Sequence, residues 1–146
     1  MSPLLNYTTT VPASRTVAAI HDLLAKSGAL QITTAYSGGT PVGVAFSFPT
    51  AAGLRAFILP VDASKVAGVL RRDQAVPNRY KTPEQAERVA WRIAKDWLEA
   101  QLAIVATEMV TLDQVMLPYM RALDGRTMWD LYLDDQLPAL APIEEE

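Results

Sequence analysis

Residues 30–48 read LQITTAYSGGTPVGVAFSF, and this stretch decides the fold. Over 30–36 and again over 42–48, larger apolar or β-branched side chains alternate with small or polar ones, which is the period of a half-buried strand. Between the two runs, Ser37 to Pro41 holds two consecutive glycines, which a tight hairpin turn favours. The stretch therefore predicts two antiparallel strands joined by a hairpin.

The segments on both sides extend this hairpin into an α+β fold. Residues 54–59 predict a further strand, and residues 6–11, rich in threonine and stopped by Pro12, predict a first one. Helical spacing of apolar side chains predicts helices at about 15–27, 62–72, 83–108 and 112–120, with a last short helix near 128–132. The main elements follow the order β-α-β-β-β-α-α-α. This order predicts an antiparallel sheet of about four strands with helices packed on one face.

The clearest helix start in the chain is Thr82-Pro83-Glu84-Gln85. A threonine cap, proline at the first helical position and glutamine three residues after the cap are typical of a helix N-terminus. The long central helix expected here, at about 83–108, carries no charge between Glu99 and Glu108. We expect its second half to be covered on most sides, by the sheet or by another subunit.

Length and composition favour one globular domain of about 1–137, followed by an acidic C-terminal tail at 138–146. The chain has 146 residues, half of them apolar and a fifth charged, so it is not typical of disordered proteins. The absence of cysteine excludes disulfides and thiolate metal sites. Neither a signal peptide nor a membrane span is recognisable, and we expect a cytoplasmic protein.

Charge is distributed unevenly along the chain. Residues 1–64 have a net charge of +1, residues 65–95 a net charge of +5, and residues 96–146 a net charge of −9. A basic segment can mark a surface for polyanions, and an acidic end can compete for that surface or recruit a basic partner.

The basic segment contains the candidate nucleic-acid site. Cations neutralise phosphates, and an aromatic ring between cations can stack on an unpaired base, as in single-strand binders. The residues expected to do this are Arg71, Arg72, Arg79, Tyr80, Lys81, Arg88 and Arg92. An ordinary solvated helix face is the alternative interpretation, because Arg92 and Asp96, like Lys95 and Glu99, are opposite charges four residues apart.

Aromatic side chains give a second candidate surface, one that would bind a protein partner. Trp97 fits the inner stripe of the long helix and is expected in the core, whereas Trp91 lies about 100° round the helix from Arg92 and is expected at a subunit contact. Trp129 and Tyr132 are expected to contact a partner near the acidic end.

No catalytic, metal or cofactor site is expected. His21 is the one histidine and is interpreted as a partly buried structural residue. The acids from Asp124 onward lack the spacing of a calcium loop, and the Ser37-Gly38-Gly39 turn lacks the lysine of a phosphate-binding loop. We therefore expect a non-enzymatic protein.

Three blocks of the chain resemble small uncharacterised proteins encoded by bacteriophages and prophages. They are NYTTTVPASRTV at 6–17, RYKTPEQAERVAWR at 79–92 and VMLPY at 115–119. The resemblance implies a setting, in the cytoplasm of a bacterial host, but it assigns no site residues. Combined with the charge pattern, it leads to the hypothesis of a phage-type protein that binds single-stranded DNA in viral DNA metabolism. The alternative is a protein-interaction or oligomeric module that binds a host protein as an anti-defence or regulatory inhibitor.

Overall fold

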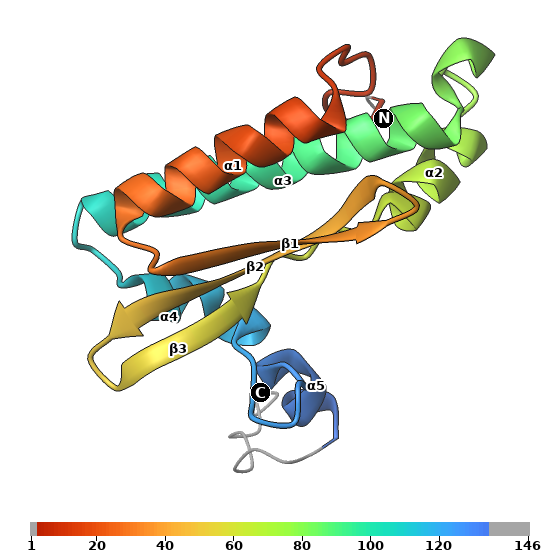
Figure 1. Ribbon diagram of the computed structural model, residues 1–146. Helices are drawn as coiled ribbons and strands as arrows, with labels where there is room; N and C mark the ends of the chain where they lie inside the picture. Colours follow the sequence, from red (N-terminus) through yellow and green to blue (C-terminus); the bar gives the residue numbers. More distant parts are fainter. Residues whose placement is uncertain (1–2, 135–146) are drawn as a thin grey trace, which may run out of the picture.

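The computed structural model of the protein describes residues 3–134, and the expected acidic tail at 138–146 lies outside them. The helices Ala13–Ser27 and Pro83–Ala106 lie side by side over the sheet (Figure 1). The helices are α1 (Ala13–Ser27), α2 (Ala63–Arg72), α3 (Pro83–Ala106), α4 (Leu112–Met116) and α5 (Met128–Leu133), the short 3-10 helices are η1 (Asn78–Tyr80) and η2 (Leu117–Tyr119), and the strands are β1 (Gln31–Ser37), β2 (Thr40–Thr50) and β3 (Gly53–Ile58). The α+β fold expected from the sequence is confirmed.

The sheet is the antiparallel meander β1-β2-β3, and its hairpin is the predicted one. Only Gly38 and Gly39 separate β1 from β2, and their φ angles of 57° and 80° fit a type I′ turn, which glycine adopts without steric cost. The register is regular from Gln31 opposite Ser47 to Ala35 opposite Gly43. A bulge in β2 then shifts Tyr36 to a position opposite Pro41.

One face of the sheet forms the core with α1, α3 and α4. Phe46 of β2 and Phe57 of β3 lie opposite each other, with stacked rings 5.4 Å apart, and both are buried. Fully buried side chains from three helices close over them: Ile20 and Leu24, Trp91 and Leu98, and Met116. Burying one such side chain contributes roughly 1.5–3 kcal/mol, so this single layer of contacts fixes the helices on the sheet.

The expected first strand is wrong. Residues 5–8 form turns, and the segment packs on α3 instead of on the sheet. The buried side chain of Gln85 donates from Nε2 to the carbonyls of Tyr7 (2.8 Å) and Thr9 (2.9 Å), so α3 takes up backbone groups that a neighbouring strand would otherwise pair. Among residues 3–134 the sheet has three strands, and an isolated antiparallel bridge from Phe57 to Met120 is the nearest feature to a fourth.

The long helix α3 begins where the sequence predicts and ends two residues early, at Ala106. The hydroxyl of Thr82 accepts from the N–H of Gln85 at 3.2 Å, which satisfies one of the free donors of the first turn. In the second half, Leu98 and Leu102 are buried while Ala103 and Ile104 are exposed. This chain therefore covers only one side of that half, which is less than expected.

The helix expected at 112–120 is divided after Met116, and the last short helix expected near 128–132 is present as α5. The expected helix at 112–120 is α4 followed by the turn η2, where Pro118 sits in the first turn. α4 and α5 both begin at a threonine whose side chain and backbone exchange hydrogen bonds with the residue three positions later, a capping box. Over residues 3–134, every helix is too short or too polar to cross a bilayer.

Candidate nucleic-acid interface

A second, smaller apolar cluster holds the basic loop in place. Leu70 of α2, Val76 of the following loop and Ala86 of α3 are buried together, and Tyr7 and Tyr80 pack against them. The cluster fixes the C-terminal end of α2 and η1 to the first turns of α3, at the end of the molecule where α2 lies in Figure 1. Cations from both segments are therefore presented at one end of the fold.

Arg71 and Arg72 end α2 and fold back over it. A Cβ placed at Gly68 would lie 3.2 Å from Nη1 of Arg72 and 3.9 Å from Nη2 of Arg71, so both guanidinium groups occupy the space above that glycine. The two groups are therefore neighbours, and both residues are exposed. A pair of adjacent guanidiniums of this kind can bind phosphate oxygens.

Arg79 and Tyr80 form a unit in η1. The Cζ atom of Arg79 lies 4.7 Å from the centroid of the Tyr80 ring, and the Tyr80 and Tyr7 rings form a T-shaped pair with centroids 5.4 Å apart. Tyr80 is half-buried by these contacts. Its ring holds Arg79 in position, and one ring face is already occupied where a stacked base was expected.

Arg88 and Arg92 lie on another side of α3. At 100° per residue, Arg88 is about 200° round the helix from Ala86, which packs toward α2, and Arg92 follows Arg88 one turn later. Arg92 pairs with Asp96 at 3.5 Å, and Arg88 donates to Oε1 of Gln85 at 3.1 Å. The seven predicted residues are thus divided into two groups, and the second group is the partly neutralised helix face that the alternative interpretation describes.

The first group keeps its charge uncompensated. Within residues 3–134 we find no carboxylate in ion-pair contact with the four cations of this group. They are Arg71, Arg72, Arg79 and Lys81, and we refer to them as the α2–η1 cations. Their arrangement offers several positive side chains to a chain of phosphates.

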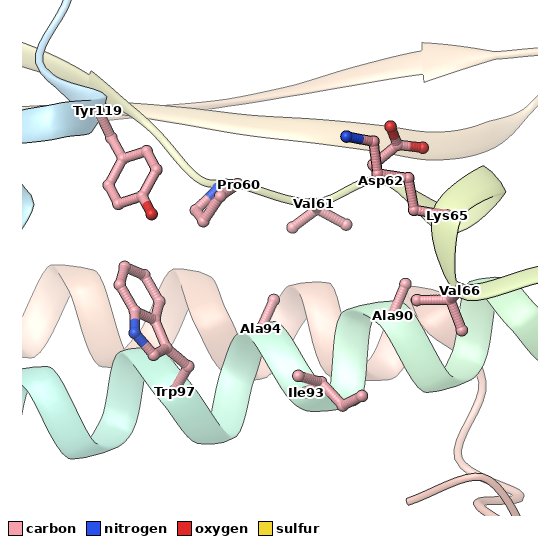
Figure 2. A pocket seen from close by; sticks show the side chains of 10 residues that line it. All are labelled: Pro60, Val61, Asp62, Lys65, Val66, Ala90, Ile93, Ala94, Trp97 and Tyr119. Carbon is pink, nitrogen blue, oxygen red and sulfur yellow. The ribbon is translucent and has the colours of Figure 1, made fainter. Parts of the chain in front are cut away.

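A groove that sequence reasoning missed runs between α3 and the β3–α2 loop (Figure 2). It has a volume of about 310 Å³, with Ala90, Ile93 and Ala94 on its α3 wall. Trp97, half-buried instead of fully in the core, meets Tyr119 edge-on at one end, with ring centroids 5.7 Å apart. No local motif marks the groove, because its walls come from three separate segments.

Asp62 and Lys65 lie at the other end of the same groove (Figure 2). The Ser64 hydroxyl donates to the Asp62 carboxylate, as does the Ser64 backbone N–H, and together they hold the pKa of Asp62 below its usual range. Asp62 is therefore the N-terminal cap of α2, and a structural role accounts for its charge.

The aromatic residues predicted to bind a partner have different positions. Trp91 is only 1% exposed, and its indole N–H donates to the Pro41 carbonyl at 3.2 Å, so its assignment to a subunit contact is wrong. A helix that packs on the sheet, α1 and α2 has a wide buried arc, and Trp91 lies inside it. Trp129 and Tyr132 are 51% and 44% exposed, with ring centroids 5.4 Å apart, and together with Leu117, Pro118 and Met128 they line an apolar hollow of about 220 Å³.

The remaining polar candidates have structural partners. Nε2 of His21 and the Thr34 hydroxyl lie 2.6 Å apart, which ties α1 to β1. Backbone and side-chain N–H groups of Arg126 donate to Asp124 and lower the pKa of that carboxyl. Asp130 caps α5. In the part of the chain from 3 to 134, His, Asp and Glu side chains nowhere gather in threes as a metal site requires.

Comparison with known proteins adds no family to this description. No protein-family model, curated protein or solved structure matches the chain.

Proposed function

We propose that this protein binds nucleic acid through phosphate contacts of the α2–η1 cations. One observation supports this most: four cations on neighbouring elements, held by one apolar cluster, have no carboxylate partner among residues 3–134. Leaving like charges together is unfavourable, and a bound polyanion compensates them. The contacts expected from the sequence for Arg88 and Arg92 form a secondary part of the proposal, because both residues have partners within the chain.

The proposed ligand is a single strand, and in the setting that the phage resemblance implies it is viral DNA. A flexible strand can follow cations that project from a helix end and a neighbouring loop, whereas a duplex presents phosphates in a fixed array. Arg79, supported by the Tyr80 ring, presents a planar cation that can contact both phosphate and base. No catalytic step is part of this proposal.

The test is the salt dependence of oligonucleotide binding, measured by fluorescence anisotropy with a labelled single strand and with the duplex of the same sequence. Four phosphate contacts predict a slope of log K against log salt of about −3 for a single strand. The double variant Arg71→Ala/Arg72→Ala should reduce the slope to about −1.5, since each lost contact removes about 0.7. Arg92→Ala/Lys95→Ala removes the same charge from residues that are already paired, and should change the slope far less.

Three results would contradict the proposal. They are no binding of either probe at low ionic strength, equal losses for the two double variants, and a slope that Arg71→Ala/Arg72→Ala leaves unchanged. Tighter binding of the duplex would support the α2–η1 cations as a nucleic-acid surface but would contradict a single strand as the ligand.

A second candidate function is the binding of a protein partner, and the exposed pair Trp129 and Tyr132 favours it. Tryptophan and tyrosine are common among the residues that contribute most to protein interfaces, and here both stand beside an apolar hollow on the surface. In the setting implied by the resemblance, the partner is a host protein that the phage protein inhibits.

This second function is tested by pull-down from nuclease-treated host lysate. A specific partner should be retained by the natural chain and lost with Trp129→Ala/Tyr132→Ala, while Arg71→Ala/Arg72→Ala should keep it. Loss with the arginine variant alone, or no retained protein, would contradict a role for the aromatic pair.

A further inference from the structure

Strand β1 is an edge strand, and among residues 3–134 no backbone group pairs with its outer side. The carbonyl of Val44 accepts from the N–H of Leu59, on the β3 side of β2. In a middle strand, the backbone groups of successive residues form hydrogen bonds alternately with the strand on one side and the strand on the other. The backbone groups of Val44 bond on the β3 side, so they form no hydrogen bond with Thr34, the residue that faces Val44 on β1. The N–H and C=O groups of Thr34, and of Ile32 two residues earlier, therefore point away from the sheet.

This edge lacks the features that normally prevent strand pairing. Soluble proteins protect exposed edges with charged side chains, prolines, bulges or very short strands. No charged residue occurs between Lys26 and Arg55, β1 itself contains no proline, and its seven residues are regular because the bulge belongs to β2. Figure 1 shows β1 along the margin of the sheet.

The exposed apolar side chains of this edge are placed symmetrically. Leu30 is 65% exposed and Tyr36 is 64% exposed, three residues before and three residues after Thr33. A two-fold axis at Thr33 would place Leu30 of one copy opposite Tyr36 of the other. The same axis would place Ile32 opposite Thr34, the two residues whose backbone groups face outward.

We propose that two copies of this chain pair through their β1 strands, antiparallel and centred on Thr33, to form one continuous six-stranded sheet. In this register the two Ile32–Thr34 pairs exchange four backbone hydrogen bonds, and each Leu30 packs on the partner's Tyr36. An antiparallel edge is complementary to itself under a two-fold axis, and two-fold symmetry is the symmetry of most homodimers.

A second copy fits this edge better than an unrelated strand does. Any strand could satisfy the backbone groups of Ile32 and Thr34, and a second copy of β1 in the reverse direction also places an apolar side chain opposite each exposed one. The chain has a net charge of −3, but residues 30–36 contain no charged side chain, so pairing through β1 brings no like charges together. The pairing uses no residue of the α2–η1 cations and is independent of the proposed function.

Sedimentation velocity of the full chain between about 5 and 500 μM tests the dimer. The mass should rise with concentration from 15.9 kDa toward twice that value. Thr33→Lys places two ammonium groups opposite each other at the axis and should weaken the dimer at least tenfold, as like charges on facing residues do. Leu54→Lys adds the same charge to an exposed position on β3 and should leave the dimer intact.

Mixing Thr33→Lys with Thr33→Glu should restore a dimer, because opposite charges then face each other. A dimer that Thr33→Lys does not weaken, or a mass of one chain at every concentration, would overturn the proposal. Thermal unfolding of Thr33→Lys beside Leu54→Lys shows whether both variants are folded.

Cysteine cross-linking tests the register, and the chain has no cysteine of its own. Facing residues of a non-hydrogen-bonded antiparallel pair have Cα atoms about 4.5 Å apart, which a disulfide can span. Thr33→Cys should therefore give a covalent dimer on mild oxidation. Positions 30 and 36 would face each other at the spacing of a hydrogen-bonded pair, about 5.5 Å between Cα atoms, which a disulfide also spans, so an equal mixture of Leu30→Cys and Tyr36→Cys should cross-link as well. Leu54→Cys is the control. Equal cross-linking of Leu54→Cys and Thr33→Cys, or none at Thr33→Cys, would rule out this pairing.

Discussion

Replacing Gln85 with leucine should loosen the N-terminal segment and destabilise the whole fold. The Gln85 side chain is 6% exposed, and its amide group donates to two carbonyls of the segment, those of Tyr7 and Thr9. Leucine has a similar size but no donor, so both carbonyls lose their partner. Each neutral hydrogen bond contributes about 1 kcal/mol, and an unpaired buried acceptor costs more, so the expected loss is about 2–3 kcal/mol.

Urea unfolding followed by circular dichroism measures this loss. With a typical slope of about 2 kcal/mol per molar urea, the midpoint should fall by about 1–1.5 M. Hydrogen exchange should accelerate across residues 4–10 more than in the sheet, because Tyr7 also loses its fixed position beside Tyr80. Gln85→Glu should be at least as destabilising, since a carboxylate cannot donate to the two carbonyls.

Gln101→Leu is the matched control, because it is the same substitution in the same helix at a half-buried position. Its effect should be within about 0.5 kcal/mol, as for ordinary surface substitutions. If Gln85→Leu is no less stable than Gln101→Leu, the reasoning that Gln85 attaches the segment to α3 is refuted.

Three further predictions concern single sites. Trp91→Phe leaves the Pro41 carbonyl without its donor and opens a small cavity, so it should lower the free energy of unfolding by about 2–4 kcal/mol, measured by urea unfolding. A loss below about 1 kcal/mol would contradict the burial described. Gly68→Ala should stabilise the protein by about 0.5–1 kcal/mol in the same assay, because the helix gains propensity and only the flexible end of Arg72 must move. Hydrogen bonds from Arg126 lower the pKa of Asp124 in the folded state, so their stabilising effect is complete well above pH 4 and is lost as the pH falls below it. The difference in unfolding free energy between the natural chain and Asp124→Asn should therefore shrink between pH 7 and pH 2.5. A difference that does not change with pH would contradict this.

The sequence was sufficient for features that depend on neighbouring residues. The hairpin at Gly38 and Gly39, the cap at Thr82 and the end of α1 at Gly28 each follow from a few residues whose preferred backbone angles decide the structure. Strand propensity misled at residues 6–11, because propensity describes a fit to a neighbouring strand, and here α3 supplies the partner through Gln85.

The candidate site was predicted only in part, for a geometric reason. Helical periodicity gives the angle of Trp91 round α3 but not the width of the buried arc, which depends on how many elements pack against the helix. Likewise, Arg72 and Arg88 belong to one basic segment of the sequence. In the fold, Arg72 lies at the end of α2, and Arg88 lies on the side of α3 that does not pack toward α2. The pairing of Arg92 with Asp96 was visible in the sequence, since it needs only the helix repeat.

The shared direction of α1 and α3 gives the molecule an electric polarity. Both helices begin at the end of the fold where α2 lies and run the same way across the sheet (Figure 1). Each helix N-terminus carries the equivalent of about +0.5 elementary charge from its aligned peptide dipoles, so the two together outweigh the opposite half-charge at the C-terminus of α2. An anion that reaches this end of the fold would be attracted by the helix ends as well as by the arginines. Because the helix ends are backbone groups, replacing the arginines would leave that short-range attraction in place.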